Sequence, residues 1–320
     1  MPTWITQLGR GRMTFAVAFA VALFIANVIS TPSFVTGGQL EVNAGTLAPF
    51  VLAAMASTPA FLSGGGGIDL SVTPLMALSN IVLVTGFLGT TLGSPLLAIP
   101  VLLLMGAFVG AGNGFLIAKL RFPPVIATLG TFFMLSGLDL ALVPNPVTAK
   151  PGWIDSLAGD VGPIPGAFFT VAIPLLCWWL LTRTPLARNI LAVGDNAASA
   201  FSAGVNVDAI RISAYALGGL LAALGGIALS GLIRSADTTS YTGYTIAALA
   251  AVALGGTNLG GGMGGLLASA FGALCIYLLN NLLASIGVSS DYIQVAYGAV
   301  LVIAVIGGST IANRSRVALA

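Results

Sequence analysis

The residues that could act chemically gather first in SGGGGIDLS, residues 63–71, where a carboxylate follows a run of glycines between two apolar stretches. An ionised aspartate at membrane depth costs about 2.5–3.5 kcal/mol even on insertion scales, so Asp69 must face protein or water. Asp69 or Ser71 can cap a helix that begins at Val72, with Pro74 in its first turn. We expect this structural role to outweigh direct contact with a ligand. The two roles are compatible, because capping groups at a broken helix can also line a polar path.

Further polar side chains lie within apolar stretches, among them Asn113, Thr128, Asn280 and Asn281. Amides and hydroxyls at membrane depth either bond across helices or line a polar cavity, and any one of them is more often structural than a ligand contact. Together, without histidine or lysine at depth, they suit a neutral polyhydroxyl solute better than an ion. With Asp69 and Ser71 they are our candidate residues for a helix break or translocation path. Asp139 lies near the outer end of its span, where we expect it to reach the membrane interface.

The residue inventory excludes most catalytic chemistry. The sequence has no histidine, which removes Ser-His-Asp and Cys-His pairs and histidine-ligated metals. Cys177 and Cys275 lie in apolar runs without metal-ligand spacing, and we interpret them as packing residues. LGGTNLGGGMGG at 254–265 resembles a phosphate loop but lacks the closing Gly-Lys-Ser/Thr. We therefore expect no catalytic site, no metal and no cofactor, and a protein that is not an enzyme.

The composition places these residues in a membrane protein. Of 320 residues 57% are hydrophobic and 6% charged, with a mean hydropathy of +1.04, whereas a soluble domain carries roughly 25% charged residues. The net charge of +2 is too small to indicate nucleic-acid binding. The lipid bilayer is therefore the expected surrounding of a single domain, residues 1–320.

Charge-free stretches of about 20 residues predict an all-α polytopic fold. We count about ten spans, at 13–30, 44–62, two in 70–118 broken near 89–95, 122–138, 161–182, 212–233, two in 238–290 broken at 254–265, and 292–313. We interpret 13–30 as a retained span rather than a signal peptide, because it is long for a signal core and no A-x-A site closes it. An even number allows two inverted five-helix halves, although no sequence repeat demonstrates them.

The basic residues orient these spans. With the N-terminus inside, nine of the eleven fall in the cytoplasm: Arg10, Arg12, Lys119, Arg121, Arg183, Arg188, Arg211, Arg314 and Arg316. Lys150 and Arg234 fall outside. This bias follows the positive-inside rule, so we expect both termini in the cytoplasm. The glycine runs at 64–67 and 254–265 should then lie on the same side of the membrane.

Residues 183–211 form the longest polar interruption that also carries several basic residues. Asp195 or Asn196 can cap a short helix at 197–203, and Gly204 can end it. Phe201 is the one large apolar side chain on that helix, and an aromatic knob on a small-residue surface suits a groove in another protein. A solvated connector between two spans explains the composition equally well. The outer segment 144–165, rich in proline and glycine, could meet an extracytoplasmic partner or serve as an ordinary loop anchored by Trp153.

Several segments, in order and covering most of residues 64–308, resemble the ribose-type sugar permease subunits of bacterial ABC importers, the inner-membrane components of binding-protein-dependent transport. They are GGIDLSV at 66–72, MALS at 76–79, NGFLIAKLRFPPVIATLGT at 113–131, TPLARNILAVGDNAASAFSAGVNVDAIR at 184–211, IAALAAVALGGTNLGGGMG at 246–264 and Asn280-Asn281. The joint order of these blocks carries the resemblance.

The resemblance implies a permease dimer, homomeric or heteromeric, in the bacterial inner membrane. Its partners would be a cytosolic ATP-binding cassette ATPase and a periplasmic sugar-binding protein. It also implies a cytoplasmic coupling helix before the seventh span, whose contacts with the ATPase map to a set of residues in the 183–211 loop: Arg188, Gly194, Asn196, Ala197, Ala198, Phe201 and Gly204. The sequence departs from the family at Ala197, where an acidic residue is usual, at Ala187-Arg188, and at Thr73-Pro74 after the GIDLSV motif.

We therefore expect the transmembrane permease subunit of an ABC importer for a monosaccharide or small polyol, working by alternating access. The alternative is an ion-driven secondary transporter or a channel for a small neutral solute. That alternative explains the spans and buried amides but leaves the 183–211 pattern unused.

Overall fold

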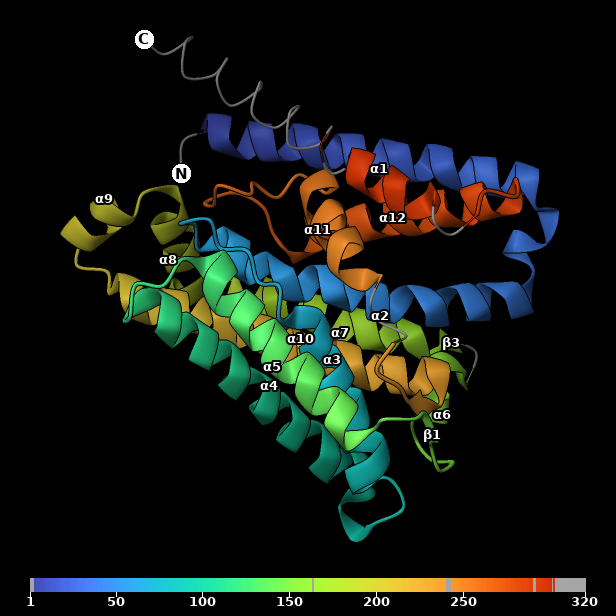
Figure 1. The fold of residues 1–320 in the computed structure, drawn as a ribbon. Helices are drawn as coiled ribbons and strands as arrows, with labels where there is room; N and C mark the ends of the chain where they lie inside the picture. The colour runs from blue at the N-terminus through green and yellow to red at the C-terminus, as the bar shows by residue number, and fades with distance from the viewer. Residues whose placement is uncertain (1–2, 163, 240–242, 290–291, 301, 303–320) are drawn as a thin grey trace.

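A computed structural model describes residues 3–162, 164–239, 243–289, 292–300 and 302, with backbone alone for residues 3–14. The apolar helices that make up the bundle in Figure 1 are α1 Thr3–Ser30, α2 Gly37–Leu62, α3 Val72–Ile81, α4 Pro95–Ala118, α5 Pro124–Leu142, α7 Gly166–Leu181, α10 Val207–Ile233, α11 Tyr244–Leu254 and α12 Leu266–Ser285. The elements that connect them include α6 Asp155–Ala158, α8 Pro185–Asp195, α9 Ala197–Ser202 and the strands β1 Val147–Thr148, β2 Asp160–Val161, β3 Ile164–Pro165 and β4 Ser235–Ala236.

Five of these helices, α2, α4, α5, α10 and α12, are long and apolar enough to cross a membrane, and α7 joined to α8 would be a sixth despite an 82° bend. Three shorter apolar helices accompany them, at Phe15–Ser30, Val72–Phe87 and Tyr244–Leu254. The chain is thus an all-α polytopic membrane protein. Both expected breaks are present: a π-helical turn extends α3 to Phe87 before α4 begins at Pro95, and residues 255–265 separate α11 from α12. Ten spans and inverted halves stay predictions, since most of 292–313 lies outside the described residues.

The centre of the bundle is the pair α2 and α10, which pack against each other and against α3. α10 also runs along α4, where glycines allow backbone contact. A Cβ on Gly106 would stand 2.3 Å from Gly219 O, and one on Gly110 would stand 2.2 Å from Tyr215 O. Small residues spaced by four bring membrane helices this close. The α4 residues facing away from α10, such as Phe108, are exposed and suit lipid.

Figure 1 shows the two ends of the bundle. One, which we call the α9 end, carries the start of α1, α8 and α9. The other, which we call the β1 end, carries β1, α6 and β3. The β1 end is closed by the antiparallel pairs β1–β4 and β2–β3. There Trp153 Nε1 donates to Gly93 O at 2.8 Å, and Arg234 meets Asp155 at 3.2 Å. The expected outer segment 144–165 is therefore a folded cap whose tryptophan is hydrogen-bonded to the backbone.

Candidate functional site

The 183–211 segment folds as two helices before α10, at the α9 end. α8 leaves α7 at 82°, with Pro185 in its first turn, where a missing N–H costs nothing. Its buried residues Ala187, Ile190 and Val193 recur every three positions, and Ile190 packs against Leu62 of α2 and Ala214 of α10. The apolar stripe therefore fixes α8 across the end of the bundle.

α9 follows α8 directly and has the caps expected from the sequence. The Asn196 side chain accepts from Ser199 N at 2.9 Å, and Gly204, at φ +84°, follows the helix in the left-handed conformation that favours glycine. The helix ends at Ser202, one residue before the expected Ala203. Phe201 projects with 72% of its surface exposed. The sequence prediction of a short capped helix with an aromatic knob is confirmed.

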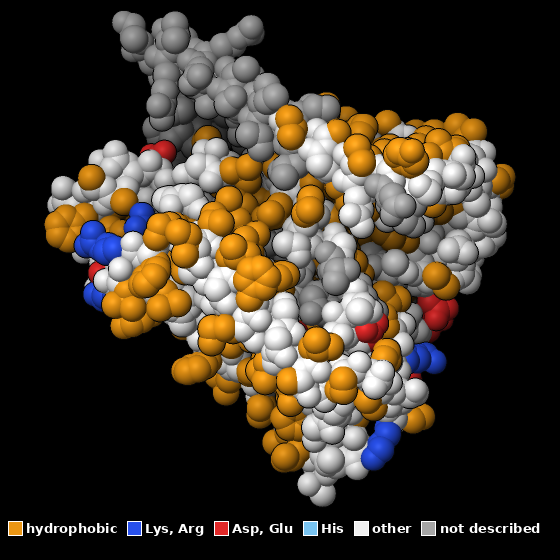
Figure 2. Space-filling model, viewed as in Figure 1, with side chains coloured by type: hydrophobic (Ala, Val, Ile, Leu, Met, Phe, Trp, Pro, Cys, Tyr) orange, Lys and Arg blue, Asp and Glu red, His pale blue; other side chains and the backbone are white. Residues whose placement is uncertain are grey.

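A groove of about 780 Å³ lies between α9, the turn after α4 and the start of α10. Its charged lining residues are Lys119, Arg121, Asp208 and Arg211, and Lys119 Nζ pairs with Asp208 Oδ2 at 2.9 Å. Figure 2 shows Lys and Arg side chains gathered at this end of the molecule. The expected coupling residues on the groove are Ala197, Ala198, Phe201 and Gly204. Arg188 lies outside it, exposed on α8 with its guanidinium near the carbonyls of Thr184 and Arg183.

Gly194, at the end of α8, has a different place: it contacts the membrane helices backbone to backbone. A Cβ there would stand 1.9 Å from Leu62 O and 2.5 Å from Gly262 N. Gly262 N in turn donates to Leu62 O at 3.2 Å, and a Cβ on Gly64 would stand 2.8 Å from Gly194 Cα. The two glycine runs, expected on the same side, therefore meet at α8. We call these contacts between Leu62, Gly64, Gly194 and Gly262 the glycine junction.

Asp69 lies five residues beyond the glycine junction, in a buried polar network. Its Oδ1 accepts from Ser71 N at 2.9 Å and from Ser71 Oγ at 2.7 Å, directly before α3 begins at Val72. Asn113 Nδ2 of α4 donates to the same Ser71 Oγ at 2.8 Å. All three residues are buried. The carboxylate thus closes a turn directly ahead of the broken helix. Ser71 occupies the N-cap position of α3, but neither its side chain nor that of Asp69 accepts from an N–H of the helix, so the expected side-chain cap is not formed.

α5 contributes the other side of this network. Thr131 Oγ1 donates to Asn113 Oδ1 at 2.5 Å, and Thr128 Oγ1 contacts Ile68 O at 3.2 Å. Of the six candidate path residues, the structure therefore links Asp69, Ser71 and Asn113 by hydrogen bonds and places Thr128 against the backbone next to Asp69. Thr131, which extends the chain of bonds from Asn113 to α5, was missed by the sequence reasoning. Thr131 lies three residues after Thr128 on one helix face, a spacing that could have revealed it.

Asn280 and Asn281 lie elsewhere. They sit on α12, which packs against α1, α2 and α11. Their neighbours are the hydroxyl groups of Tyr297 and Tyr277, and Tyr277 also donates to Asn43 Oδ1 at 3.1 Å. The candidate path residues therefore form two separate groups.

Other buried polar groups were not expected. Thr58 Oγ1 donates to Ser269 Oγ at 2.7 Å, which links α2 to α12, and Asn80 Nδ2 donates to Ser230 Oγ at 2.9 Å, which links α3 to α10. Asp139 is fully buried on α5, so the expectation that it reaches the interface is wrong: helix packing encloses that turn of α5. Among the described residues, no three His, Cys, Asp or Glu side chains are placed to hold a metal ion.

Comparisons with known proteins agree with this architecture. Residues 39–305 match the family model described as branched-chain amino acid transport system / permease component. A ribose import permease of Bacillus subtilis (strain 168) is 39% identical over 247 residues, 75% of this chain and 76% of the relative. One from Escherichia coli (strain K12) is 35% identical over 298 residues, 91% of each chain. A fructose import permease of Rhizobium meliloti is 35% identical over 252 residues, 75% of this chain and 69% of the relative. No solved structure matches the chain. The chain therefore belongs to this permease family, with the ribose-type permease subunits of ABC importers.

Proposed function

We propose that the chain forms one half of the translocation path of an importer for a monosaccharide or related small polyol, driven by a cytosolic ATPase that docks at α9. The glycine junction is the observation that carries this proposal. It places α8 in backbone contact with the end of α2 and with the loop before α12. Movement of α9 would therefore reach the membrane helices without a flexible side chain between them.

The docking surface is the groove beside α9. Phe201 and the small residues Ala197 and Ala198 line it on one side, and basic residues line the other. A protruding aromatic side chain anchors well in a partner's pocket, because it contributes a large contact area at little entropic cost. Gly194, Asn196 and Gly204 would shape this element, and Arg188 would contact the ATPase beside the groove.

The proposed cycle is alternating access. ATP binding would close the ATPase dimer and move α9 and α8, and the glycine junction would pass this movement to α2 and to the Asp69 segment. Such coupling requires that the contacts at the two sites differ between the two states. Asp69, Ser71, Asn113 and Thr128 would line or order the path at the broken helix, and Asn280 with Asn281 would act separately on α12.

The relatives' printed names supply the substrate class, since they describe import permeases for ribose, fructose and autoinducer 2. A neutral polyhydroxyl solute also fits the amides and hydroxyls of the buried network. A periplasmic sugar-binding protein would deliver the solute at the β1 end, and a second permease, a copy or a paralogue, would form the other half of the path. The chain would lie in the bacterial inner membrane with both termini in the cytoplasm.

Phe201→Asp tests the docking surface. The chain should insert and fold normally, because Phe201 is largely exposed, but a charge at the apolar anchor should abolish the stimulation of ATP hydrolysis by sugar. The assay uses vesicles that hold the permease, its ATPase and the sugar-loaded binding protein. Ser202→Asp is the matched control, since it adds the same charge on α9 at a residue that does not line the groove. Full stimulation in Phe201→Asp would refute the assignment. Failure of the native chain to co-purify with an ATPase would favour the secondary transporter instead.

A further inference from the structure

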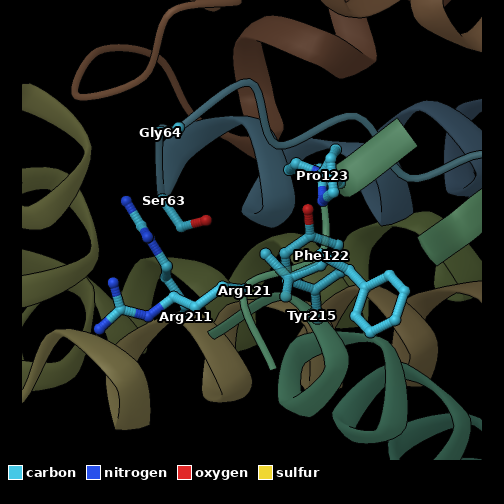
Figure 3. A pocket seen from close by; sticks show the side chains of 10 residues that line it. Ser63, Gly64, Arg121, Phe122, Pro123, Arg211 and Tyr215 are labelled. Carbon is cyan, nitrogen blue, oxygen red and sulfur yellow. The ribbon is translucent and has the colours of Figure 1, made fainter. Parts of the chain in front are cut away.

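A second, smaller cavity lies beside the groove, at the α9 end. Its volume is about 250 Å³, and it is enclosed by the start of the 63–71 segment, the turn between α4 and α5, and the first turns of α10. Figure 3 shows Ser63 and Tyr215 projecting toward the same space, with the side chains of Arg121 and Arg211 on one side of it. The cavity is thus built from three separate parts of the chain.

The charged side chains that line this cavity are both positive. Neither arginine forms an ion pair with any described residue, and no acidic side chain lines the cavity. The neighbouring cation, Lys119, is paired with Asp208. The backbone of Arg121 has φ at +61°, a left-handed conformation that is uncommon in residues other than glycine. Two guanidinium groups therefore face one cavity, and neither has an ion-pair partner among the described residues.

Two buried hydrogen-bond donors at the cavity also lack an acceptor among the residues that the structure describes. Tyr215 is 1% exposed and its hydroxyl has no partner, although it lines the cavity. The Nε of Arg211 is buried and likewise has none. Asp69 lies near enough to interact electrostatically with Tyr215, but no hydrogen bond between described residues joins the two and Asp69 does not line the cavity. Buried polar groups without partners are rare in folded proteins, and each one calls for an explanation. An anion with several oxygen acceptors would satisfy both donors and both charges.

We propose that Arg121, Arg211 and Tyr215 form a binding site for a phosphate group. The guanidinium fork matches phosphate oxygens bidentately, and a neutral hydroxyl supplies a further donor. The phosphate could belong to a soluble ion or ester, or to the head group of an anionic lipid. In the second case, the exposed side chains of Phe122, which lines the cavity, and of Leu120 offer apolar surface for acyl chains. Arg121 and Arg211 also line the groove beside α9, so a phosphate bound to them would also affect the charged lining of that groove.

The test measures ligand binding and does not depend on the transport function. The full chain is placed in nanodiscs of neutral phosphatidylcholine, and its unfolding temperature is followed against inorganic phosphate, with chloride keeping the ionic strength constant. A second arm replaces part of the lipid with phosphatidylglycerol and measures its retention by native mass spectrometry. Tyr215→Phe removes only the hydroxyl, and Arg211→Gln removes the charge and the fork. Arg183→Gln is the matched control, because Arg183 lies outside the cavity and stacks on Trp179.

We expect saturable binding of at least one probe to the native chain and to Arg183→Gln. Binding should weaken by about tenfold or more in Arg211→Gln and in Tyr215→Phe, because each loses a hydrogen bond to a charged ligand. A response to inorganic phosphate alone identifies a soluble source, and retention of phosphatidylglycerol alone identifies a lipid head group. If neither probe binds, if Tyr215→Phe binds as the native chain does, or if Arg183→Gln weakens binding equally, the proposal is wrong.

Discussion

Ser71 is the residue at which the buried network is joined. Its hydroxyl donates to Asp69 and accepts from Asn113, so one oxygen links the broken helix to α4. Asn113 passes the link to α5 through Thr131. Each such hydrogen bond between membrane helices contributes only a modest free energy. Removal of one partner costs more, because it leaves the other polar group buried and without a hydrogen bond.

Removal of this hydroxyl should therefore destabilise the fold. We expect Ser71→Ala to lower the free energy of unfolding by about 1–3 kcal/mol, because the Asn113 amide loses its acceptor and Asp69 loses one donor. Denaturant titration in mixed micelles measures the change. Ser79→Ala is the control: its hydroxyl is equally buried on the same helix but bonds only to the helix carbonyl of Leu75. Equal losses in the two variants would show that Ser71 has no special role.

Single polar residues could be predicted from the sequence, whereas their assembly could not. Asp69 and Ser71 are close in sequence, so the turn that they form before α3 follows from local chemistry. Asn113 and Thr128 reach them only because α4 and α5 pack against the broken helix. Asn280 has the same chemistry, but α12 carries it to a different neighbourhood. Packing partners of helices decide which buried amides meet, and no local pattern encodes them.

At the scale of elements, the contact of α4 with α10 rests on glycines of one helix face. Gly106 and Gly110 let the backbone of α10 approach so closely that no Cβ fits. This contact also places Asn113 of α4 at the Asp69 network and Tyr215 of α10 at the cavity. Two helices in backbone contact at these glycines thus position both polar sites.

A methyl group in this contact should separate the helices. We expect Gly110→Ala to reduce the free energy of unfolding by about 1–3 kcal/mol or more, because its Cβ would meet the Tyr215 carbonyl oxygen at 2.2 Å and backbone cannot rotate away. Gly112→Ala, on the same helix with nothing within 4 Å of its Cβ, should gain up to about 1 kcal/mol from helix propensity. Denaturant titration of both variants measures the two changes in the free energy of unfolding. A Gly110→Ala chain as stable as Gly112→Ala would contradict the close contact.

α9 and α8 show what local signals can and cannot predict. Asn196 and Gly204 mark both ends of α9, because caps are chemical requirements of a helix terminus. α8 was missed, although Pro185 and the spacing of Ala187, Ile190 and Val193 are helical signals. The polar and basic residues between them look like a loop, and only the packing of the apolar stripe against Leu62 and Ala214 identifies a helix. The helical conformation of α8 therefore depends on tertiary contacts that the local sequence does not reveal.

The whole molecule has two chemically different ends. Figure 2 shows most Lys and Arg side chains at the α9 end and a few at the opposite end. Lys119, Arg121 and Arg211 line the groove beside α9, and Arg183 and Arg188 lie just before and within α8. Lys150 and Arg234 lie next to β1 and β4 in the chain. The breaks near residues 89–95 and 254–265 could be predicted from the sequence, because the charge-free stretches that contain them are too long for one helix across a bilayer. The number of spans could not be fixed in the same way, because α3 and α11 are shorter than a bilayer crossing and only their packing against α2 shows where they belong.

Cysteine labelling decides the orientation. Cys177 and Cys275 are first replaced by alanine, and a single cysteine then replaces Ser199 on α9 or Ser156 at the β1 end, both of which are exposed. Each variant is treated with a membrane-impermeant maleimide. The excess of basic residues at the α9 end predicts that this end stays in the cytoplasm. Ser156→Cys should therefore react in intact spheroplasts, and Ser199→Cys only after permeabilisation. Retained sugar-stimulated ATP hydrolysis shows that both variants are folded. If Ser199→Cys were labelled from outside, the α9 end would lie outside the cell. An ATPase in the cytosol could then not reach α9, and the proposed orientation would be wrong.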